Sequence, residues 1–189
     1  MKYALLSSLV IVHLAACTPS ANDELPAFEQ EAKAAITEFA GQLKSALQNA
    51  MQSGGPGTAV NVCQVQAPKI AEALAAKTGF EIGRTSLKVR NPANQPQPWQ
   101  QIVLNNFESQ KQSGTPVNEM QFVAVSDDSE SLRFMKAINT ETVCLTCHGQ
   151  NISTALQTEI NRLYPEDQAT GFKQNDIRGA FSVVKYRDD

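Results

Sequence analysis

An α+β fold, with an antiparallel sheet and flanking helices in a single domain, is predicted by three observations. Helical patterns open the chain, strand-like segments follow them, and two of those segments stand on either side of a short polar turn, "DDSE". Consecutive strands joined by a tight turn pair in antiparallel fashion. The chain has 189 residues and a formal net charge of −3, so one folded core is expected and a nucleic-acid partner is not.

The first residues have the pattern of an export signal. Lys2 precedes an apolar run that is too short to span a bilayer comfortably, and the run ends in "LAAC". This ending resembles the bacterial lipobox, in which cleavage falls before the cysteine and the cysteine is lipidated. We predict a lipoprotein signal peptide at residues 1–16, lipidation at Cys17 and a polar tether at residues 17–27. An ordinary signal peptide and an uncleaved anchor are the alternatives.

The signal also predicts where the protein resides. A lipidated Cys17 would hold it on the periplasmic side of a bacterial membrane, and Thr18 after that cysteine favours the outer membrane. The domain itself is expected at residues 28–187, and no later segment is long and apolar enough to cross a membrane.

Helices of this domain are expected where apolar residues recur at helical spacing. They are predicted at residues 28–53, about 57–78, 99–107 and 154–163. The sequence "SGGPG" ends the first helix, and Pro68 is expected to kink or restart the second.

Strands are expected where apolar and polar residues alternate, at residues 80–90, 119–126, 131–138 and about 177–187. The middle two should form a hairpin around "DDSE". In the first strand, "FEIGRTSLKVR", alternation places Arg84, Ser86, Lys88 and Arg90 on one face.

The stretch "ETVCLTCHGQ" contains two cysteines separated by two residues and followed at once by a histidine: Cys144, Cys147 and His148. This order is the attachment signature of c-type haem, in which two thioethers hold the porphyrin and the histidine binds the iron. Export supports the prediction, because cytochrome c maturation occurs outside the cytoplasm. We predict one covalent haem c, on a short helix capped by Thr140 and ended by Gly149.

Three other uses of these cysteines compete with haem attachment. A thioredoxin-like CxxC needs a βαβ setting, which the sequence does not show. A zinc site could use Cys63, Cys144, Cys147 and His148, but adjacent Cys147 and His148 make tetrahedral closure awkward. A disulfide between Cys144 and Cys147 would close a very tight ring.

The ligand on the other side of the iron is less clearly indicated. The second of the two histidines, His13, would leave with the signal peptide. The remaining candidates are Cys63, one of Met51, Met120 and Met135, or an open position. Each of these sulfur side chains could instead be an ordinary buried apolar residue of the core. The number of available ligand residues does not by itself decide among these alternatives.

Five segments in one order, "NVCQVQAPKIA", "RTSLKVRNPAN", "CLTCHG", "LYPEDQATGF" and "DIRGAFSV", resemble a PAS-like c-type haem family (Tll-type, formerly a domain of unknown function). The resemblance covers about residues 28–187. It implies a PAS-like antiparallel sheet and iron ligation by His148 and Cys63. The family includes stand-alone cyanobacterial proteins and sensory ends of signalling receptors. This chain shows no receptor or kinase segment, so signalling would pass through a partner protein.

Polar residues near the expected site offer further candidates. Arg84, Lys88 and Arg90 could contact haem propionates, although a solvated strand face is an equal alternative. Tyr164 and Arg178 are candidate polar groups of the pocket, or simply structural residues.

Three classes of function remain. The first is a redox or diatomic-gas sensor that acts through a protein partner, because a thiolate that leaves the iron on reduction provides a two-state element. The second is a periplasmic electron-transfer cytochrome. The third is an enzyme. The sequence shows neither a pair of carboxylates nor a nucleophile beside a base that would support this class.

Overall fold

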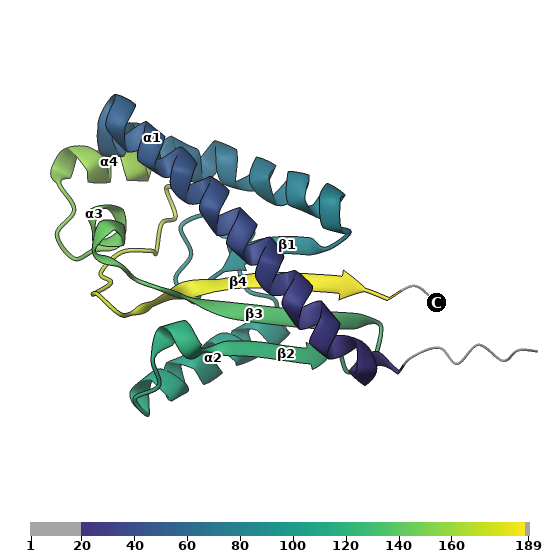
Figure 1. The fold of residues 1–189 in the computed structure, drawn as a ribbon. Coiled ribbons are helices and arrows are strands. Elements are labelled where there is room, and N and C mark those ends of the chain that lie inside the picture. Colours follow the sequence, from purple (N-terminus) through teal and green to yellow (C-terminus); the bar gives the residue numbers. More distant parts are fainter. Residues whose placement is uncertain (1–19, 188–189) are drawn as a thin grey trace, which may run out of the picture.

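A four-stranded antiparallel sheet forms the centre of the protein in the computed structural model, which describes residues 20–187 (Figure 1). The strands are β1 (Glu81–Thr85), β2 (Gln121–Val125), β3 (Ser131–Asn139) and β4 (Ile177–Tyr186). Their order in the sheet is β1-β4-β3-β2. The predicted α+β class with an antiparallel sheet is confirmed. The predicted signal peptide, Cys17 and Thr18 lie outside the described residues.

The predicted hairpin is confirmed. β2 and β3 pair antiparallel, from Gln121 opposite Lys136 to Val125 opposite Leu132, so "DDSE" is the turn between them. The turn is closed by Ser126, whose backbone N–H donates to the Ser131 carbonyl at 2.8 Å. β3 and β4 form the centre of the sheet.

Helix α1 (Ala21–Thr78) has two arms that meet at Gly55. Gly55 has φ +70° and ψ −168°, a combination that a side chain would hinder, so the "SGGPG" break is confirmed. At this point the chain reverses, and the second arm runs back beside the first (Figure 1). Lys77 of the second arm contacts Glu38 of the first at 2.8 Å.

The predicted tether is wrong over its last residues, because α1 begins at Ala21 rather than at residue 28. Ser20 and Asp23 form a capping box at the helix start. Ala21 and Leu25 then pack against the hydrophobic core, and this contact supports helix in a segment whose composition favours a linker.

The second arm continues through Pro68 to Thr78, so the predicted restart of the helix at the proline is wrong. Proline removes one backbone hydrogen bond from a helix and costs free energy. Packing on both sides of it holds the arm together, since Val60 and Leu74 are each 2% exposed and belong to two different core clusters.

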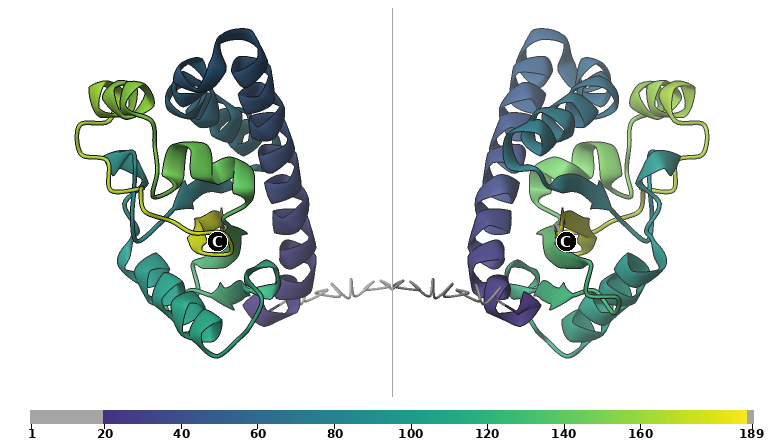
Figure 2. Two further views of the ribbon diagram at one scale, coloured as in Figure 1. Left: turned by 90° about the vertical axis from the view of Figure 1, so that its left-hand side faces the viewer. Right: turned by 90° about the vertical axis from the view of Figure 1, so that its right-hand side faces the viewer.

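The sheet is covered on both faces, as Figure 2 shows from two sides. Phe28, Phe39 and Leu74 of α1 pack on Leu132 and Phe134 of β3 and on Val183 of β4. Val103, Leu104 and Phe107 of α2 (Pro98–Gln112) pack with Met135 and Ala137 on the opposite face. The even and odd residues of β3 thus face different helices, as a strand requires.

Short elements complete the domain. They are the 3₁₀ turns Pro92–Asn94, Val117–Glu119 and Thr142–Cys144, and the helices α3 (Leu145–His148) and α4 (Thr154–Leu163). The predicted helices at 99–107 and 154–163 are therefore confirmed within a few residues. No helix between residues 20 and 187 has the length and apolar character needed to span a membrane.

Strand β1 is shorter than the predicted strand at residues 80–90, and the predicted alternation fails after Thr85. Leu87 is 39% exposed, whereas Ser86 and Arg90 are buried. The Ser86 hydroxyl donates to the Arg178 carbonyl at 2.9 Å and accepts from the Lys88 N–H at 3.1 Å. These side-chain bonds replace sheet pairing and turn the chain away from β4.

Candidate functional site

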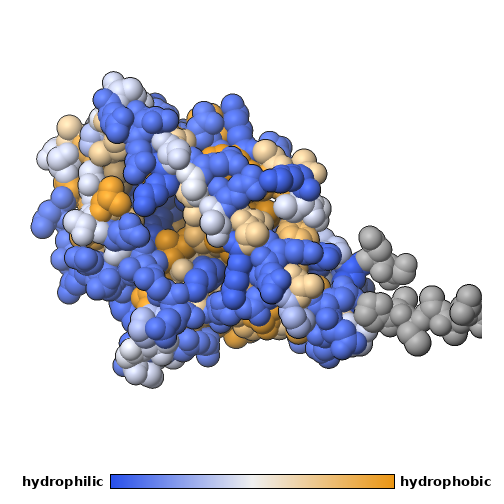
Figure 3. All heavy atoms as spheres, viewed as in Figure 1, coloured by the Kyte–Doolittle hydropathy of each residue, from blue (hydrophilic) through white to orange (hydrophobic). Residues whose placement is uncertain are grey.

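A cavity open on one side lies between the second arm of α1, helix α3 and the end of the sheet, with an empty volume of about 1120 Å³ including its mouth. Cys63, Cys144, Cys147 and His148 all line it, although 81 residues separate the first from the second in the chain numbering. On the face shown in Figure 3, hydrophobic residues gather in a hollow beneath α1, with hydrophilic residues around it.

The CxxCH segment forms a 3₁₀ turn followed by the single-turn helix α3. Gly149 ends this helix as predicted, and its N–H donates to the Leu145 carbonyl at 3.0 Å. The predicted cap at Thr140 is wrong, since Glu141 is the N-cap of the 3₁₀ turn. Thr140 is fully buried and exchanges backbone hydrogen bonds with the 175–176 segment instead.

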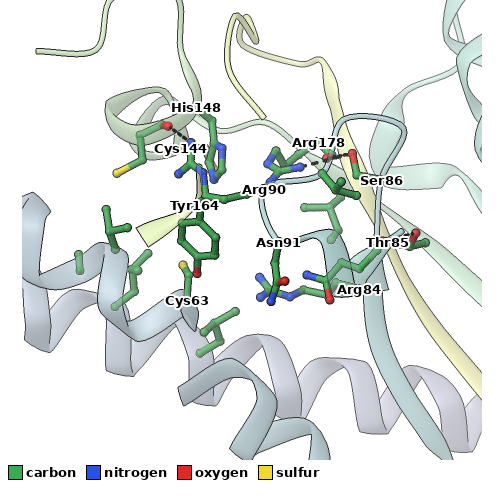
Figure 4. A pocket seen from close by; sticks show the side chains of 18 of the residues that line it. Cys63, Arg84, Thr85, Ser86, Arg90, Asn91, Cys144, His148, Tyr164 and Arg178 are labelled. Carbon is green, nitrogen blue, oxygen red and sulfur yellow. Dashed lines mark hydrogen bonds between the residues drawn. The ribbon is translucent and has the colours of Figure 1, made fainter. Parts of the chain in front are cut away.

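His148 points into the cavity (Figure 4), and its ring is held from behind. Its Nδ1 lies 2.7 Å from the Ala169 carbonyl oxygen. A carbonyl only accepts, so Nδ1 carries the proton and Nε2 keeps a lone pair, which is the tautomer of a metal ligand. Burial, with Arg178 and Arg90 nearby, holds the pKa of His148 well below its usual value, so the imidazole is neutral.

Cys63 lies on the second arm of α1, across the cavity from His148 in Figure 4. The thiols of Cys63, Cys144 and Cys147 are free and half-buried, so the predicted alternative of a Cys144–Cys147 disulfide is not formed. Burial raises the pKa of the Cys147 thiol.

The remaining alternatives find no support in the geometry. Within residues 20–187, no three His, Cys, Asp or Glu side chains come together in a way that would hold a metal ion such as zinc. Met120 and Met135 are buried in the core cluster under α2, and Met51 packs between the arms of α1. None of these three methionines lines the cavity.

Two arginines line the cavity without a carboxylate partner in the part of the chain described, Arg84 and Arg178. The Arg84 guanidinium lies 5.6 Å from the centre of the Phe39 ring, and that of Arg178 lies 5.2 Å from the Phe172 ring. Burial lowers the pKa of both, that of Arg178 to about 10. Partly buried cations without a carboxylate partner favour an anionic group in the cavity.

Arg90 and Lys88, unlike Arg84, do not offer a free cation to the cavity. Arg90 is bound to Asp167 at 3.0 Å in a pair that is almost fully buried. Lys88 lies outside the cavity lining, with its ammonium 5.5 Å from the centre of the Phe172 ring. Asp167 lies in the segment "LYPEDQATGF", but nothing in that segment links it to Arg90, which is 77 residues away in the chain.

Tyr164, a polar candidate from the sequence, lines the cavity and is 4% exposed. Burial first, and then the nearby Cys63, raises the pKa of its phenol to about 12. The hydroxyl is therefore a neutral donor beside the sulfur of Cys63 (Figure 4).

Comparisons with known proteins agree with this architecture. The crystal structure of the cyanobacterial heme-protein Tll0287 is similar, with a TM-score of 0.67 and 23% sequence identity, covering 87% of this chain and 98% of that one. A search of curated proteins finds no match. The profile of the Tll0287-like family matches residues 20–185, and we conclude that the chain belongs to the Tll0287-like family.

Proposed function

We propose that this chain is a c-type haem protein in which Cys144 and Cys147 carry one haem covalently and His148 and Cys63 bind its iron from opposite sides. The observation that carries the proposal is the His148 imidazole, fixed as the Nδ1–H tautomer by Ala169 and facing the cavity that Cys63 lines from the other wall. A similar solved structure is described as a heme-protein, which supports the assignment.

The residues around the cavity fit such a group. Leu43, Leu47 and Val60 supply apolar wall on the α1 side, where a porphyrin ring would lie. Arg84 and Arg178 supply partly buried positive charge without a carboxylate partner within residues 20–187. Haem propionates are carboxylates, so these two arginines are the side chains we assign to them. Arg90 is already bound to Asp167 and is not assigned this role.

The chain's own residues suggest what the protein does with the haem. A bound haem would supply one-electron redox chemistry and a coordination position for a diatomic gas. The Cys63 sulfur, as a thiolate, favours ferric iron, and the reduction potential is therefore expected to be low. Cys63 would hold the oxidised form of such a group as a thiolate, and its sulfur could take a proton and withdraw if reduction of the group weakened that bond.

This ligand change supports sensing as the function. Departure of Cys63 would leave one coordination position open to CO, NO or O₂ beside the Tyr164 hydroxyl, which lines the same cavity. The result is an element with two states biased by redox state or by gas. We propose a redox or gas sensor that signals through a protein partner.

An electron-transfer cytochrome is the alternative, and one observation favours it. Val143, which lines the cavity next to the attachment cysteines, is 57% exposed. The edge of a haem attached there would lie close to solvent, where a redox partner could approach.

We also propose that the protein is anchored by lipid on Cys17 at the periplasmic side of a bacterial membrane. The "LAAC" sequence supports this proposal. Cys17→Ser should abolish labelling by a fatty-acid analogue in cells, whereas wild type should be labelled. An unlabelled wild type would leave an ordinary exported protein.

A reversible redox titration with optical spectra, with and without CO, tests the function. A sensor should change ligation on reduction and bind CO. An electron carrier should show a reversible one-electron titration without a change of iron ligand, and its reduced spectrum should be the same with and without CO. A purified wild-type protein without porphyrin would refute both the sensor and the electron-carrier proposal.

A further inference from the structure

The backbone carbonyl of Ala169 receives two donors. His148 Nδ1 lies 2.7 Å from its oxygen, and Arg90 Nη2 lies 3.3 Å from the same oxygen. One carbonyl thus serves both the imidazole that faces the cavity and a guanidinium behind it. Because both donors draw on the lone pairs of one oxygen, the charge beside Ala169 affects the bond to His148.

The two N–H groups of Arg90 Nη2 are shared among three acceptors, of which the Ala169 carbonyl is the most distant. Arg90 Nη2 also donates to the Cys147 carbonyl at 2.6 Å and to Asp167 Oδ2 at 3.0 Å. The other oxygen of Asp167 accepts from the Ala169 N–H at 2.8 Å. Asp167, Arg90 and Ala169 therefore form a closed ring of hydrogen bonds, and this ring also contacts the residue before His148.

Burial makes this arrangement costly if it serves packing alone. The side chains of Arg90 and Asp167 are 8% and 3% exposed. Desolvating two charges largely cancels their attraction, and apolar residues of similar volume often stabilise a core as well. The pair lies, however, against the carbonyl that orients His148, where a charge affects the ligand directly.

We infer that Arg90 and Asp167 are positioning residues that set the electron-donor strength of His148 through the Ala169 carbonyl. This inference rests on the proposed haem ligation. Groups behind a ligating histidine fix its orientation and change its basicity. Here the cation of Arg90 weakens the carbonyl as an acceptor for the Nδ1 proton, and the anion of Asp167 offsets that effect.

The two charges should act in opposite directions. Arg90→Gln removes the competing cation and leaves Asp167 negative, so His148 becomes a stronger donor and ferric iron is favoured. Asp167→Asn leaves the cation unopposed, so ferrous iron is favoured. We expect the equilibrium constant for one-electron reduction to fall about tenfold in the first variant and to rise about tenfold in the second, which corresponds to about 59 mV each way.

The double variant Arg90→Gln with Asp167→Asn distinguishes an effect transmitted through the Ala169 carbonyl from a direct effect of the net charge near His148. It leaves no unpaired buried charge, so it should fold even if a single variant does not. Its reduction equilibrium should lie between those of the two single variants. The NMR resonance of the His148 Nδ1 proton should nevertheless move in the direction seen for Arg90→Gln, because the cationic donor to Ala169 is gone.

Purified wild-type holoprotein and a surface control are measured beside these variants. Arg162→Gln also removes one positive charge, but its side chain is 62% exposed and pairs with Glu159 on the surface of α4. It should change neither readout. Opposite shifts in the single variants, with a moved Nδ1 resonance in the double variant, would support the inference.

Two results would overturn it: a reduction equilibrium that shifts the same way in both single variants, or a His148 Nδ1 resonance in the double variant that stays at the wild-type position. The proposed function fails separately, if the wild-type protein carries no haem or if its iron is not bound by His148.

Discussion

The two walls of the cavity hold their candidate ligands in different ways. On one wall, His148 is fixed by the Ala169 carbonyl, and its own carbonyl accepts from the Phe172 N–H at 3.0 Å. On the other wall, Cys63 lies on the second arm of α1, and its thiol forms no disulfide within the residues described. One side chain is over-determined by its surroundings, and the other is held by its helix backbone.

This difference suggests that the two side chains have different roles, one as a permanent ligand and the other as an exchangeable one. The His148 wall includes a second backbone hydrogen bond, since the Gly171 N–H donates to the Gly149 carbonyl at 3.0 Å. A side chain fixed this firmly would stay on a bound metal through a redox cycle. A sulfur that only its helix positions can leave and return at small cost, which a sensor needs and an electron carrier avoids.

The largest expected effect comes from removing the attachment on the His148 wall. Cys144→Ala with Cys147→Ala should abolish covalent haem, because no thioether can form. Acid–acetone extraction checks this, since any haem left in the variant should enter the solvent whereas wild-type haem should stay with the protein. Covalent haem that survives in the double variant would contradict the assignment.

A second expected effect is on stability and concerns the buried ion pair of the same wall. Asp167→Ala leaves the Arg90 guanidinium buried without its counter-ion, and should lower the free energy of unfolding by about 3–5 kcal/mol. Denaturant titration measures it.

The matched control for Asp167 is Glu159→Ala, which removes a carboxylate from an exposed pair with Arg162. Exposed pairs contribute little, so this variant should unfold nearly as wild type does. Equal losses of unfolding free energy in Asp167→Ala and Glu159→Ala would mean that burial does not make the Arg90–Asp167 pair more important for stability than an exposed pair.

Tyr164, between the two walls, gives a smaller and pH-dependent effect. Its pKa is raised from about 10 to about 12, chiefly by burial, so the folded state binds the phenolic proton more tightly than the unfolded state. The stabilisation is complete below the unfolded pKa and is lost as pH rises through the folded pKa. From about pH 9 to about pH 12 the loss should reach roughly 2–3 kcal/mol.

Tyr164→Phe should remove this part of the pH dependence. Other tyrosines and thiols titrate in both proteins, so the difference between the two unfolding curves isolates Tyr164. Parallel curves over the whole alkaline range would show that the phenol is not buried as described.

The smallest expected effect is on the optical spectrum of the methionine variants. Met120 and Met135 are 1% and 0% exposed and pack under α2, away from the cavity. Met120→Leu and Met135→Leu conserve volume and should leave the haem spectrum unchanged. A shifted spectrum in either variant would reopen methionine as the ligand opposite His148.

Much of this site could be predicted from the sequence because its signals are local. Cys144, Cys147 and His148 form one contiguous motif, and the period of two in β2 and β3 marks the hairpin. The break at Gly55 follows from glycines that only a turn favours.

The errors arise where distant packing overrides a local signal. Pro68 stays helical because the core holds the arm on both sides of it. Residues from Ala21 become helical because Leu25 meets the core. Arg90 was placed on an alternating strand, but its partner Asp167 lies on a distant loop that composition does not mark.

The ferric EPR spectrum of wild type and of Cys63→Ala tests most directly whether the two walls bind one iron from opposite sides. Wild type should show a low-spin signal typical of thiolate ligation. Cys63→Ala should show a high-spin or water-bound ferric haem, with His148 still attached. Cys63→Met, which substitutes a neutral sulfur, should raise the reduction potential. A low-spin thiolate signal that survives Cys63→Ala would contradict the assignment of Cys63.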